Sequence, residues 1–214
     1  MKIGILGSGG VAQALGSGLL GLGHEVTLGT RDKAKLAEWL KKINSPKADV
    51  GSFAEAAAFG EIIFLTTHGV ATIGAIDMAG RQNFAGKIVI DVTNPLDFSG
   101  GVPPKFAATL DNSLGEQIQK HLPQSKVVKA FNTIGAHIMI KAKRDEGTPD
   151  LFIAGNDAAA KQWIADLAQK WGWLSTIDLG GIENSYWLET FAMLWIVYGF
   201  KNNSWNHAFK LLKK

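Results

Sequence analysis

The sequence predicts an α/β protein: a doubly wound Rossmann-type fold with a parallel sheet and a short C-terminal helical segment. Short β-branched runs alternate with helix-forming segments along most of the 214 residues, as in successive βαβ crossovers. The interiors of these runs are apolar throughout, which is typical of strands buried on both faces of a parallel sheet. A glycine-rich turn follows the first run, and nine of the 25 glycines fall within the first 29 positions.

The expected elements follow one another as strand, helix, strand through most of the chain. Asp157, just before one predicted helix, is a suitable N-cap. The expected strands are Lys2–Leu6, Glu25–Leu28, Glu61–Thr66, Lys87–Val92, Lys126–Ala130, Leu151–Ala154 and Leu174–Asp178. The expected helices are Val11–Leu22, Lys33–Ile43, Ser52–Phe59, Val70–Ala79, Ser113–His121 and Asp157–Trp171. The loop Asn94–Pro104 holds three of the six prolines and two adjacent glycines, so we expect it to be irregular and to overhang the carboxyl edge of the sheet.

The last third of the chain differs in composition. Six of the seven tryptophans lie in the final 52 residues, and the helix expected over Thr190–Phe200 is apolar on every face. We therefore divide the chain into a Rossmann domain, residues 1–180, and a helical segment, residues 181–214, that packs on this domain and on a second subunit. Burial wholly within one chain remains the alternative to this homodimer.

Composition excludes several classes of protein. The absence of cysteine excludes disulfide frameworks and thiolate metal sites. The net charge of +3 comes from four lysines after residue 200. The rest of the chain has 18 basic and 19 acidic residues, so its charge is nearly balanced and no nucleic-acid partner is expected. The apolar stretch Thr190–Phe200 is too short to span a membrane, for which about 20 residues are needed. With no targeting segment visible, we expect a cytoplasmic protein.

The glycine-rich turn has the pattern of a dinucleotide-binding site. Gly7-Ser8-Gly9-Gly10-Val11-Ala12 directly follows the first strand, opens a helix and fits G-x-G-x-x-A. Gly7 permits the tight turn, Gly9 lets a pyrophosphate approach the backbone, and Ala12 allows close packing of helix on strand. The helix N-terminus would supply free N–H groups to the phosphates.

The end of the second strand indicates which dinucleotide binds. NAD sites usually place a carboxylate there, whereas this chain has Gly29-Thr30-Arg31. A hydroxyl followed by arginine would bind a 2′-phosphate through charge-assisted hydrogen bonds, and Lys33 and Lys35 add positive charge. NADP is therefore predicted over NAD.

Several ordered motifs resemble one family. These motifs are the glycine-rich turn, Gly29-Thr30-Arg31-Asp32 and Val128-Lys129-Ala130-Phe131-Asn132-Thr133-Ile134-Gly135. On their basis the chain resembles the NADPH-dependent coenzyme F420 reductases. It is also similar to the cytosolic oxidoreductase domain of the six-transmembrane ferric reductases. The resemblance extends over nearly the whole chain, including Leu179 to Ser185.

This resemblance implies roles for individual residues. Ser8 to Ala12 would hold the pyrophosphate, and Thr30, Arg31 and Lys35 the 2′-phosphate. Thr66, Thr67 and His68 would contact the ribose and nicotinamide. The turns at Asn94-Pro95 and at Asn132, Thr133 and Ala136 would direct the nicotinamide face toward the second substrate. Asn184 and Ser185 match positions near the acceptor. The chain departs from the deazaflavin reductases at Asn132, where they carry histidine, and at Tyr186, where they carry arginine.

No catalytic acid–base pair stands out in the sequence. The five histidines show no metal-ligand spacing, so no metal site is expected, and His137 and Lys141 are weak candidates for a proton donor. Hydride transfer to a flavin-type ring needs stacking and orientation from the protein, while solvent can supply the proton. Asp91 is expected to bond to nearby loop amides.

We therefore expect an NADP-dependent oxidoreductase that exchanges a hydride between NADP(H) and a small-molecule acceptor of flavin type, either coenzyme F420 or a flavin (FMN or FAD). One alternative is an imine or carbonyl reductase of a small metabolite. Another is an NADPH-binding redox sensor without turnover.

Overall fold

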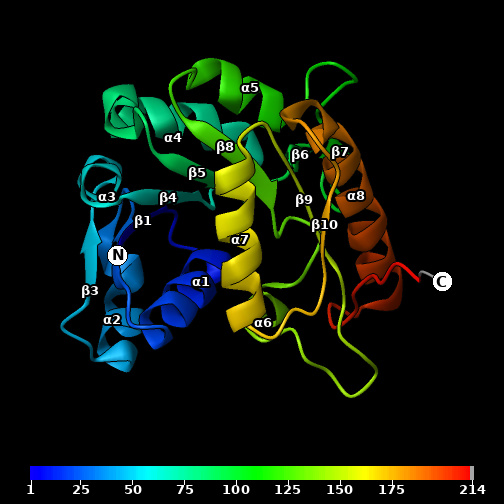
Figure 1. Cartoon of the computed structure of the whole chain (residues 1–214), viewed down its shortest axis with the longest axis horizontal. Helices are drawn as coiled ribbons and strands as arrows, with labels where there is room; N and C mark the ends of the chain where they lie inside the picture. Colours follow the sequence, from blue (N-terminus) through cyan, green and yellow to red (C-terminus); the bar gives the residue numbers. More distant parts are fainter. Residues whose placement is uncertain (213–214) are drawn as a thin grey trace.

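A computed structural model describes residues 1–212 and confirms a Rossmann-type α/β fold with helices on both faces of one large sheet (Figure 1). The eight-stranded sheet has the order β10-β9-β8-β5-β4-β1-β2-β3. Its strands are β1 (Lys2–Leu6), β2 (Glu25–Gly29), β3 (Ala48–Gly51), β4 (Ile62–Leu65), β5 (Ile88–Asp91), β8 (Lys126–Ala130), β9 (Leu151–Gly155) and β10 (Thr176–Asp178). A separate hairpin pairs β6 (Leu96–Asp97) with β7 (Lys105–Phe106).

Eight α-helices accompany the strands in the described part of the chain. They are α1 (Gly10–Gly21), α2 (Ala37–Ile43), α3 (Phe53–Phe59), α4 (Thr72–Ala79), α5 (Leu114–His121), α6 (Ala136–Met139), α7 (Ala158–Lys170) and α8 (Ser185–Asn202). Short 3-10 helices lie at η1 (Lys33–Leu36), η2 (Gly69–Ala71), η3 (Arg81–Phe84) and η4 (Ile182–Asn184).

Two apolar clusters form the core, one on each face of the sheet. Leu15 of α1 and Ile164 of α7 belong to the first, and Ala56 of α3 and Ile118 of α5 to the second. All four residues of β4 are buried, as the uniformly apolar run predicts. This arrangement places the carboxyl ends of β1, β2, β4, β5 and β8 along one edge of the sheet.

The predicted parallel sheet is confirmed except at one pairing, because β9 runs antiparallel to β8. Between these strands the chain forms only the four-residue helix α6 and a loop, so no crossover carries it back across the sheet. β10 then pairs parallel with β9. The topology thus departs from a doubly wound sheet at the β8–β9 step.

Smaller differences concern short or polar segments. The sequence predicted no strand at β3, whose four residues include a charge and lie at the sheet edge. The helix predicted over Lys33–Ile43 is divided into η1 and α2. The loop Asn94–Pro104, predicted to be irregular, contains the strand β6, which pairs with β7 just after the loop to form a hairpin. Leu174 is 81% exposed and lies outside β10, which is shorter than the predicted strand.

The C-terminal segment forms one long helix and a return strap. Helix α8 lies at the opposite side of the molecule from α2 and α3 (Figure 1). After Asn203 the chain runs back along α8, where Trp195 Nε1 donates to the carbonyl oxygen of His207 at 2.9 Å and Phe191 packs on Phe209. No helix within residues 1–212 is long and apolar enough to cross a membrane.

Candidate functional site

The turn between β1 and α1 requires glycine at its first position. Gly7 has a φ of 145°, and a Cβ atom on it would collide with Thr66. The Gly7 N–H donates to the carbonyl oxygen of Gly29 at 2.9 Å, and Thr66 Oγ1 donates to that of Leu6 at 2.9 Å. The ends of β1, β2 and β4 are therefore joined tightly beneath the turn.

Above this turn the backbone is open. Gly9 and Gly10 are exposed, and a Cβ atom on either would have no neighbour within 4 Å. No side chain caps α1, whose first backbone bond runs from the Gln13 N–H to the Gly9 carbonyl at 3.1 Å. Ser8 is half-buried, Val11 partly exposed and Ala12 buried in the core. The geometry thus suits a phosphate group, which would accept from the free N–H groups.

The segment after β2 presents two free cations. Thr30 is buried, and its hydroxyl accepts from the Asp32 N–H at 3.1 Å and donates to the Asp32 carbonyl at 3.2 Å. This bonding fixes the bend that exposes Arg31 and Lys35, neither of which forms an ion pair within residues 1–212. Lys33, in contrast, lies 3.4 Å from Glu55. Arg31 and Lys35 are therefore available to an anionic ligand.

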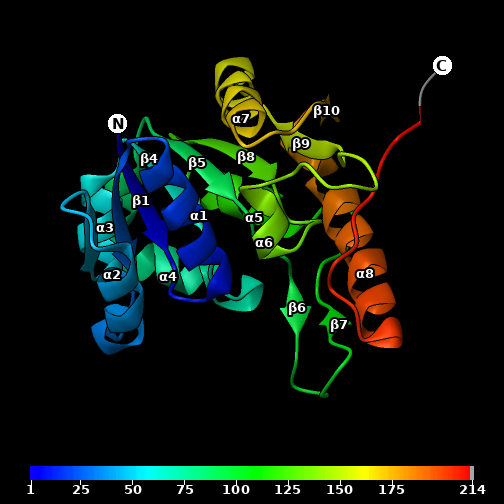
Figure 2. The same cartoon turned by 90° about the horizontal axis from the view of Figure 1, so that it is seen from below.

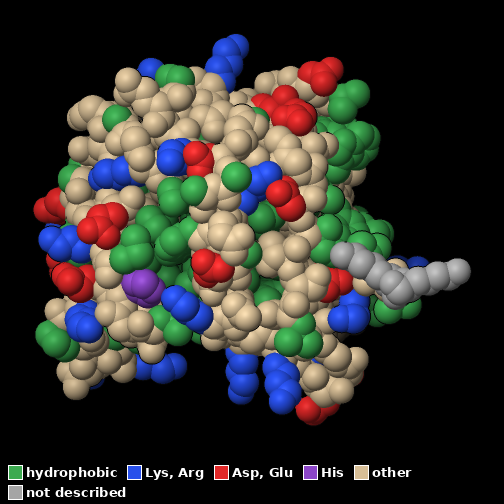
Figure 3. Space-filling view, in the orientation of Figure 1, with side chains coloured by type: hydrophobic (Ala, Val, Ile, Leu, Met, Phe, Trp, Pro, Cys, Tyr) green, Lys and Arg blue, Asp and Glu red, His purple; other side chains and the backbone are tan. Residues whose placement is uncertain are grey.

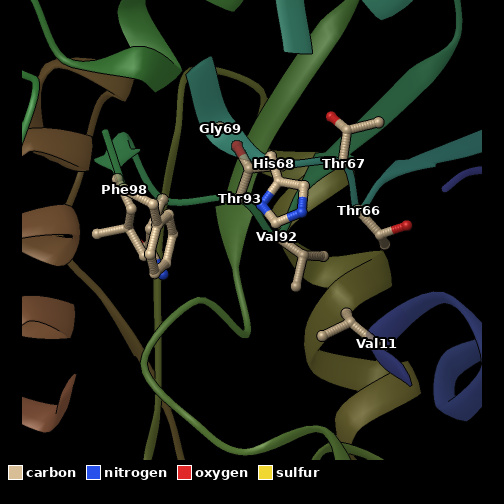
Figure 4. A pocket seen from close by; sticks show the side chains of 10 residues that line it. Val11, Thr66, Thr67, His68, Gly69, Val92, Thr93 and Phe98 are labelled. Atoms are coloured by element: carbon tan, nitrogen blue, oxygen red, sulfur yellow. The ribbon is translucent and has the colours of Figure 1, made fainter. Parts of the chain in front are cut away.

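A pocket of about 160 Å³ opens at the carboxyl ends of β4 and β5 (Figure 4). It brings together five residues expected at the cofactor site, namely Val11, Thr66, Thr67, His68 and Asn94. It also contains five that the sequence did not indicate, namely Gly69, Val92, Thr93, Leu96 and Phe98. The rings of His68 and Phe98 face each other edge to face across it, with centroids 6.3 Å apart.

Asn94 and Asn132 bind one another beside this pocket. Asn94 Nδ2 donates to the backbone carbonyl of Asn132 at 2.8 Å, and Asn132 Nδ2 donates to that of Leu188 at 3.0 Å and to Asn94 Oδ1 at 2.9 Å. Because each amide donates to a backbone carbonyl, the orientation of both side chains is determined. Asn132 Oδ1 is buried and has no partner in the described chain. This arrangement makes Asn132 a support for Asn94.

Four of the eight residues expected around the ribose and nicotinamide lie outside the pocket lining. Asn132, Thr133 and Pro95 are buried, and Ala136 is half-buried at the start of α6. Pro95 follows β5 and the other three follow β8, where the backbone carbonyl of Asn132 accepts from Asn94. Their positions suit a role in holding these loops.

A buried charge cluster lies behind the same loops. The Lys129 ammonium lies 2.7 Å from Asp91 Oδ2 and 2.7 Å from Glu189 Oε1, and all three side chains are inaccessible to solvent. Burial opposes the charge on Lys129, but the two carboxylates outweigh it and raise the pKa of Lys129 above its ordinary value. Asp91 also accepts from the N–H and hydroxyl of Thr93, as expected for a carboxylate bonded to its loop.

Glu189 extends this cluster to a helix N-terminus. Its two carboxylate oxygens accept from the N–H groups of Leu114 and Gly115, each at 3.0 Å, in the first turn of α5. Neither the cluster nor Phe98 was identified from the sequence. The sequence around Lys129 predicts a strand and that around Glu189 an apolar helix, so neither charge indicates a partner. Phe98 is a single aromatic residue in a Pro/Gly-rich loop.

The two residues expected near the acceptor lie apart from the pocket. Ser185 is buried against Gly115 of α5, and its hydroxyl has no partner in the described chain. Asn184 Nδ2 donates to the carbonyl of Leu179 at 2.8 Å. Their neighbour Tyr186 packs edge to face on Phe106 of β7 at 6.1 Å. Among Asn184, Ser185 and Tyr186, it is therefore Tyr186 that contacts the hairpin bordering the pocket.

Comparison with known proteins gives consistent matches. Residues 2–95 match the family model of the coenzyme F420-dependent NADP oxidoreductases. The chain is 30% identical to the F420-dependent NADP reductase of Methanocaldococcus jannaschii, with 95% of each chain covered. It is 29% identical to metalloreductase STEAP3 of Rattus norvegicus over 90% of this chain but only 36% of that protein.

Solved structures agree with these matches. A crystal structure from Arthrobacter sp. FB24, provisionally named an F420-dependent NADP reductase, is 41% identical over the whole of both chains with a TM-score of 0.93. A reductive aminase from Aspergillus terreus shares the fold, with a TM-score of 0.65 at 17% identity.

Proposed function

Because the chain belongs to the F420-dependent NADP reductase family, we propose that this NADP-dependent oxidoreductase exchanges a hydride between NADP(H) and the deazaflavin ring of coenzyme F420. The observation that carries the cofactor half of this proposal is the open glycine turn above β1, together with Arg31 and Lys35 after β2, which form no ion pair within residues 1–212.

The turn and the cations would hold different parts of NADP(H). The pyrophosphate would lie on the backbone from Gly7 to Ala12 at the uncapped N-terminus of α1. Arg31 and Lys35 would bind the 2′-phosphate, with Thr30 bracing the bend that presents them. The nicotinamide would occupy the pocket formed by Thr66, Thr67, His68 and Asn94, supported by the loop residues Pro95, Asn132, Thr133 and Ala136.

The pocket chemistry favours a ring acceptor. When bound, NADPH supplies a hydride, and the deazaflavin gains that hydride together with one proton. Among the ten lining residues His68 is the single titratable side chain, and it is exposed, so solvent can supply the proton. The lining therefore positions and shields the reacting rings without an acid–base pair. A flavin could be reduced in the same way.

The imine or carbonyl reductase alternative has less support. Such a reaction needs a proton donor placed beside the substrate, and the lining supplies only the exposed His68 for that role. The similarity to imine-reducing enzymes is limited to the fold.

Anaerobic mixing of the protein with NADPH and candidate acceptors tests the proposal. Coenzyme F420 should oxidise NADPH rapidly, FMN more slowly, and cyclic imines or ferric chelates not at all. Binding of NADPH without oxidation by any acceptor would instead identify a redox sensor. Rapid oxidation by an imine alone would establish the alternative enzyme.

We further propose that residues 181–214 join two copies of the chain through α8. Of this segment, residues 213–214 lie outside the described part. One face of α8 packs on its own chain through Leu188, Ala192 and Ile196. The other exposes Trp187, Leu194, Val197 and Tyr198, each close to half accessible and spaced as in a coiled-coil seam. Apolar side chains gather along this edge of the molecule (Figure 3).

A further inference from the structure

The β6–β7 hairpin projects from the sheet beside α8 (Figure 2), and its residues Leu96 and Phe98 line the pocket. Leu96 pairs with Phe106, and Asp97 pairs with Lys105. The Asp97 carboxylate accepts from the N–H and the hydroxyl of Ser99 at 2.8 and 2.9 Å, and these bonds hold the pKa of Asp97 below its usual range. The hairpin is thus ordered where it leaves the pocket.

Two aromatic residues of the hairpin point to different neighbours. Phe106 packs on Tyr186 of α8, which anchors the far side of the hairpin. Phe98 lines the pocket and meets the edge of His68. Phe98 remains 45% exposed, so much of its ring is open to solvent.

The size of the pocket determines what can bind inside it. A cavity of about 160 Å³ is smaller than the roughly 300 Å³ of sites that enclose a drug-sized ligand. The nicotinamide end of the cofactor would fill most of this space. The acceptor ring would then lie at the rim, where Phe98 is exposed and none of the lining residues has a permanent charge.

We propose that Phe98 is the stacking platform for the acceptor ring and that it selects flat aromatic acceptors over compact polar ones. The inference rests on the proposed function, since it assigns the acceptor half of the same site. The ring would stack on Phe98 and meet His68 at its edge, where offset and edge-to-face contacts are favourable. Phe98 acts through binding and orientation, and the proton and hydride do not pass through it.

The test measures acceptor binding without turnover. The fluorescence of oxidised coenzyme F420 is titrated with the protein saturated with NADP⁺, a pair that cannot react. Phe98→Ala should raise the dissociation constant of F420 about threefold to tenfold. Phe98→Tyr should restore it to near the wild-type value, and the dissociation constant of NADP⁺ should be unchanged in both variants.

Val102→Ala is the matched control, because Val102 is 68% exposed on the same hairpin and does not line the pocket. It should bind F420 as the wild type does. If the wild type binds F420 and Phe98→Ala binds it equally well, the inference is wrong while the proposed function stands. If the wild type with NADP⁺ binds neither F420 nor FMN, the acceptor half of the proposed function is wrong and the inference with it.

Discussion

The ammonium group of Lys129 lies 2.7 Å from a carboxylate oxygen of Glu189, and no water can reach either side chain. Lys129 belongs to β8 and Glu189 to α8, so this pair fixes the C-terminal helix to the sheet. Since Glu189 also binds the first turn of α5 and Lys129 binds Asp91, one cluster joins α8, α5, β8 and β5. The loops behind the pocket start from these elements.

Replacing Lys129 by methionine should destabilise the fold strongly. The variant leaves two buried carboxylates without their cation, and breaking a buried pair in this way costs about 3–5 kcal/mol. Urea denaturation would measure the loss. Lys33→Met is the control, because water and salt screen the exposed pair with Glu55, so that this pair should contribute little to stability. Equal stabilities of the two variants would show that the cluster has no role in folding.

Replacing Gly9 by alanine should weaken cofactor binding without changing the fold. Gly9 has an ordinary φ of −76° and open space around it, so the protein itself tolerates a methyl group there. That methyl group would occupy the approach of the pyrophosphate, and the dissociation constant of NADPH should rise at least about tenfold. Thermal melting and NADPH titration measure the two effects.

Gly21→Ala gives the matched control, since its Cβ would be equally unobstructed at the other end of α1. Its NADPH affinity should equal that of the wild type. Normal binding of NADPH by Gly9→Ala would contradict the placement of the pyrophosphate at this turn.

Replacing Arg31 by alanine should change the choice of cofactor. Loss of a charge-assisted bond to the 2′-phosphate should raise the dissociation constant of NADPH at least about tenfold and leave that of NADH unchanged. Lys42→Ala, on the exposed side of α2, should alter neither. Equal weakening of NADPH and NADH in Arg31→Ala would contradict the assignment of the 2′-phosphate.

Replacing Leu194 by glutamate should separate the proposed dimer. Leu194 is 57% exposed in the middle of the apolar face of α8, so a charge there would be buried without a partner between two subunits. Sedimentation should show a dimer for the wild type at micromolar concentration and a monomer for Leu194→Glu. A monomeric wild type would rule out the α8 interface.

The sequence predicted those parts of the fold that depend on local pattern. The uniformly apolar strands and the Gly7–Ala12 turn lie where expected, because burial and positive φ leave direct traces in residue type. The antiparallel β9 was missed because strand direction depends on the path of the connection, and β9 itself has the composition of a buried parallel strand.

Contacts between distant segments could not be predicted from the sequence. Lys129 has no local feature that indicates its two carboxylate partners, and Phe98 meets His68 only after the hairpin folds beside β4. Ser185, expected near the acceptor, is buried because Gly115 lets α8 approach α5 closely. Tertiary packing determines these positions.

Transfer of deuterium from NADPH tests the central claim most directly. The protein is mixed anaerobically with NADPH carrying deuterium on both C4 positions and with oxidised coenzyme F420, and the reduced deazaflavin is analysed by mass spectrometry. Direct hydride transfer predicts one deuterium retained on the deazaflavin carbon for each NADPH oxidised. Reduced F420 without deuterium, or NADPH that binds but is not oxidised, would contradict the proposed function.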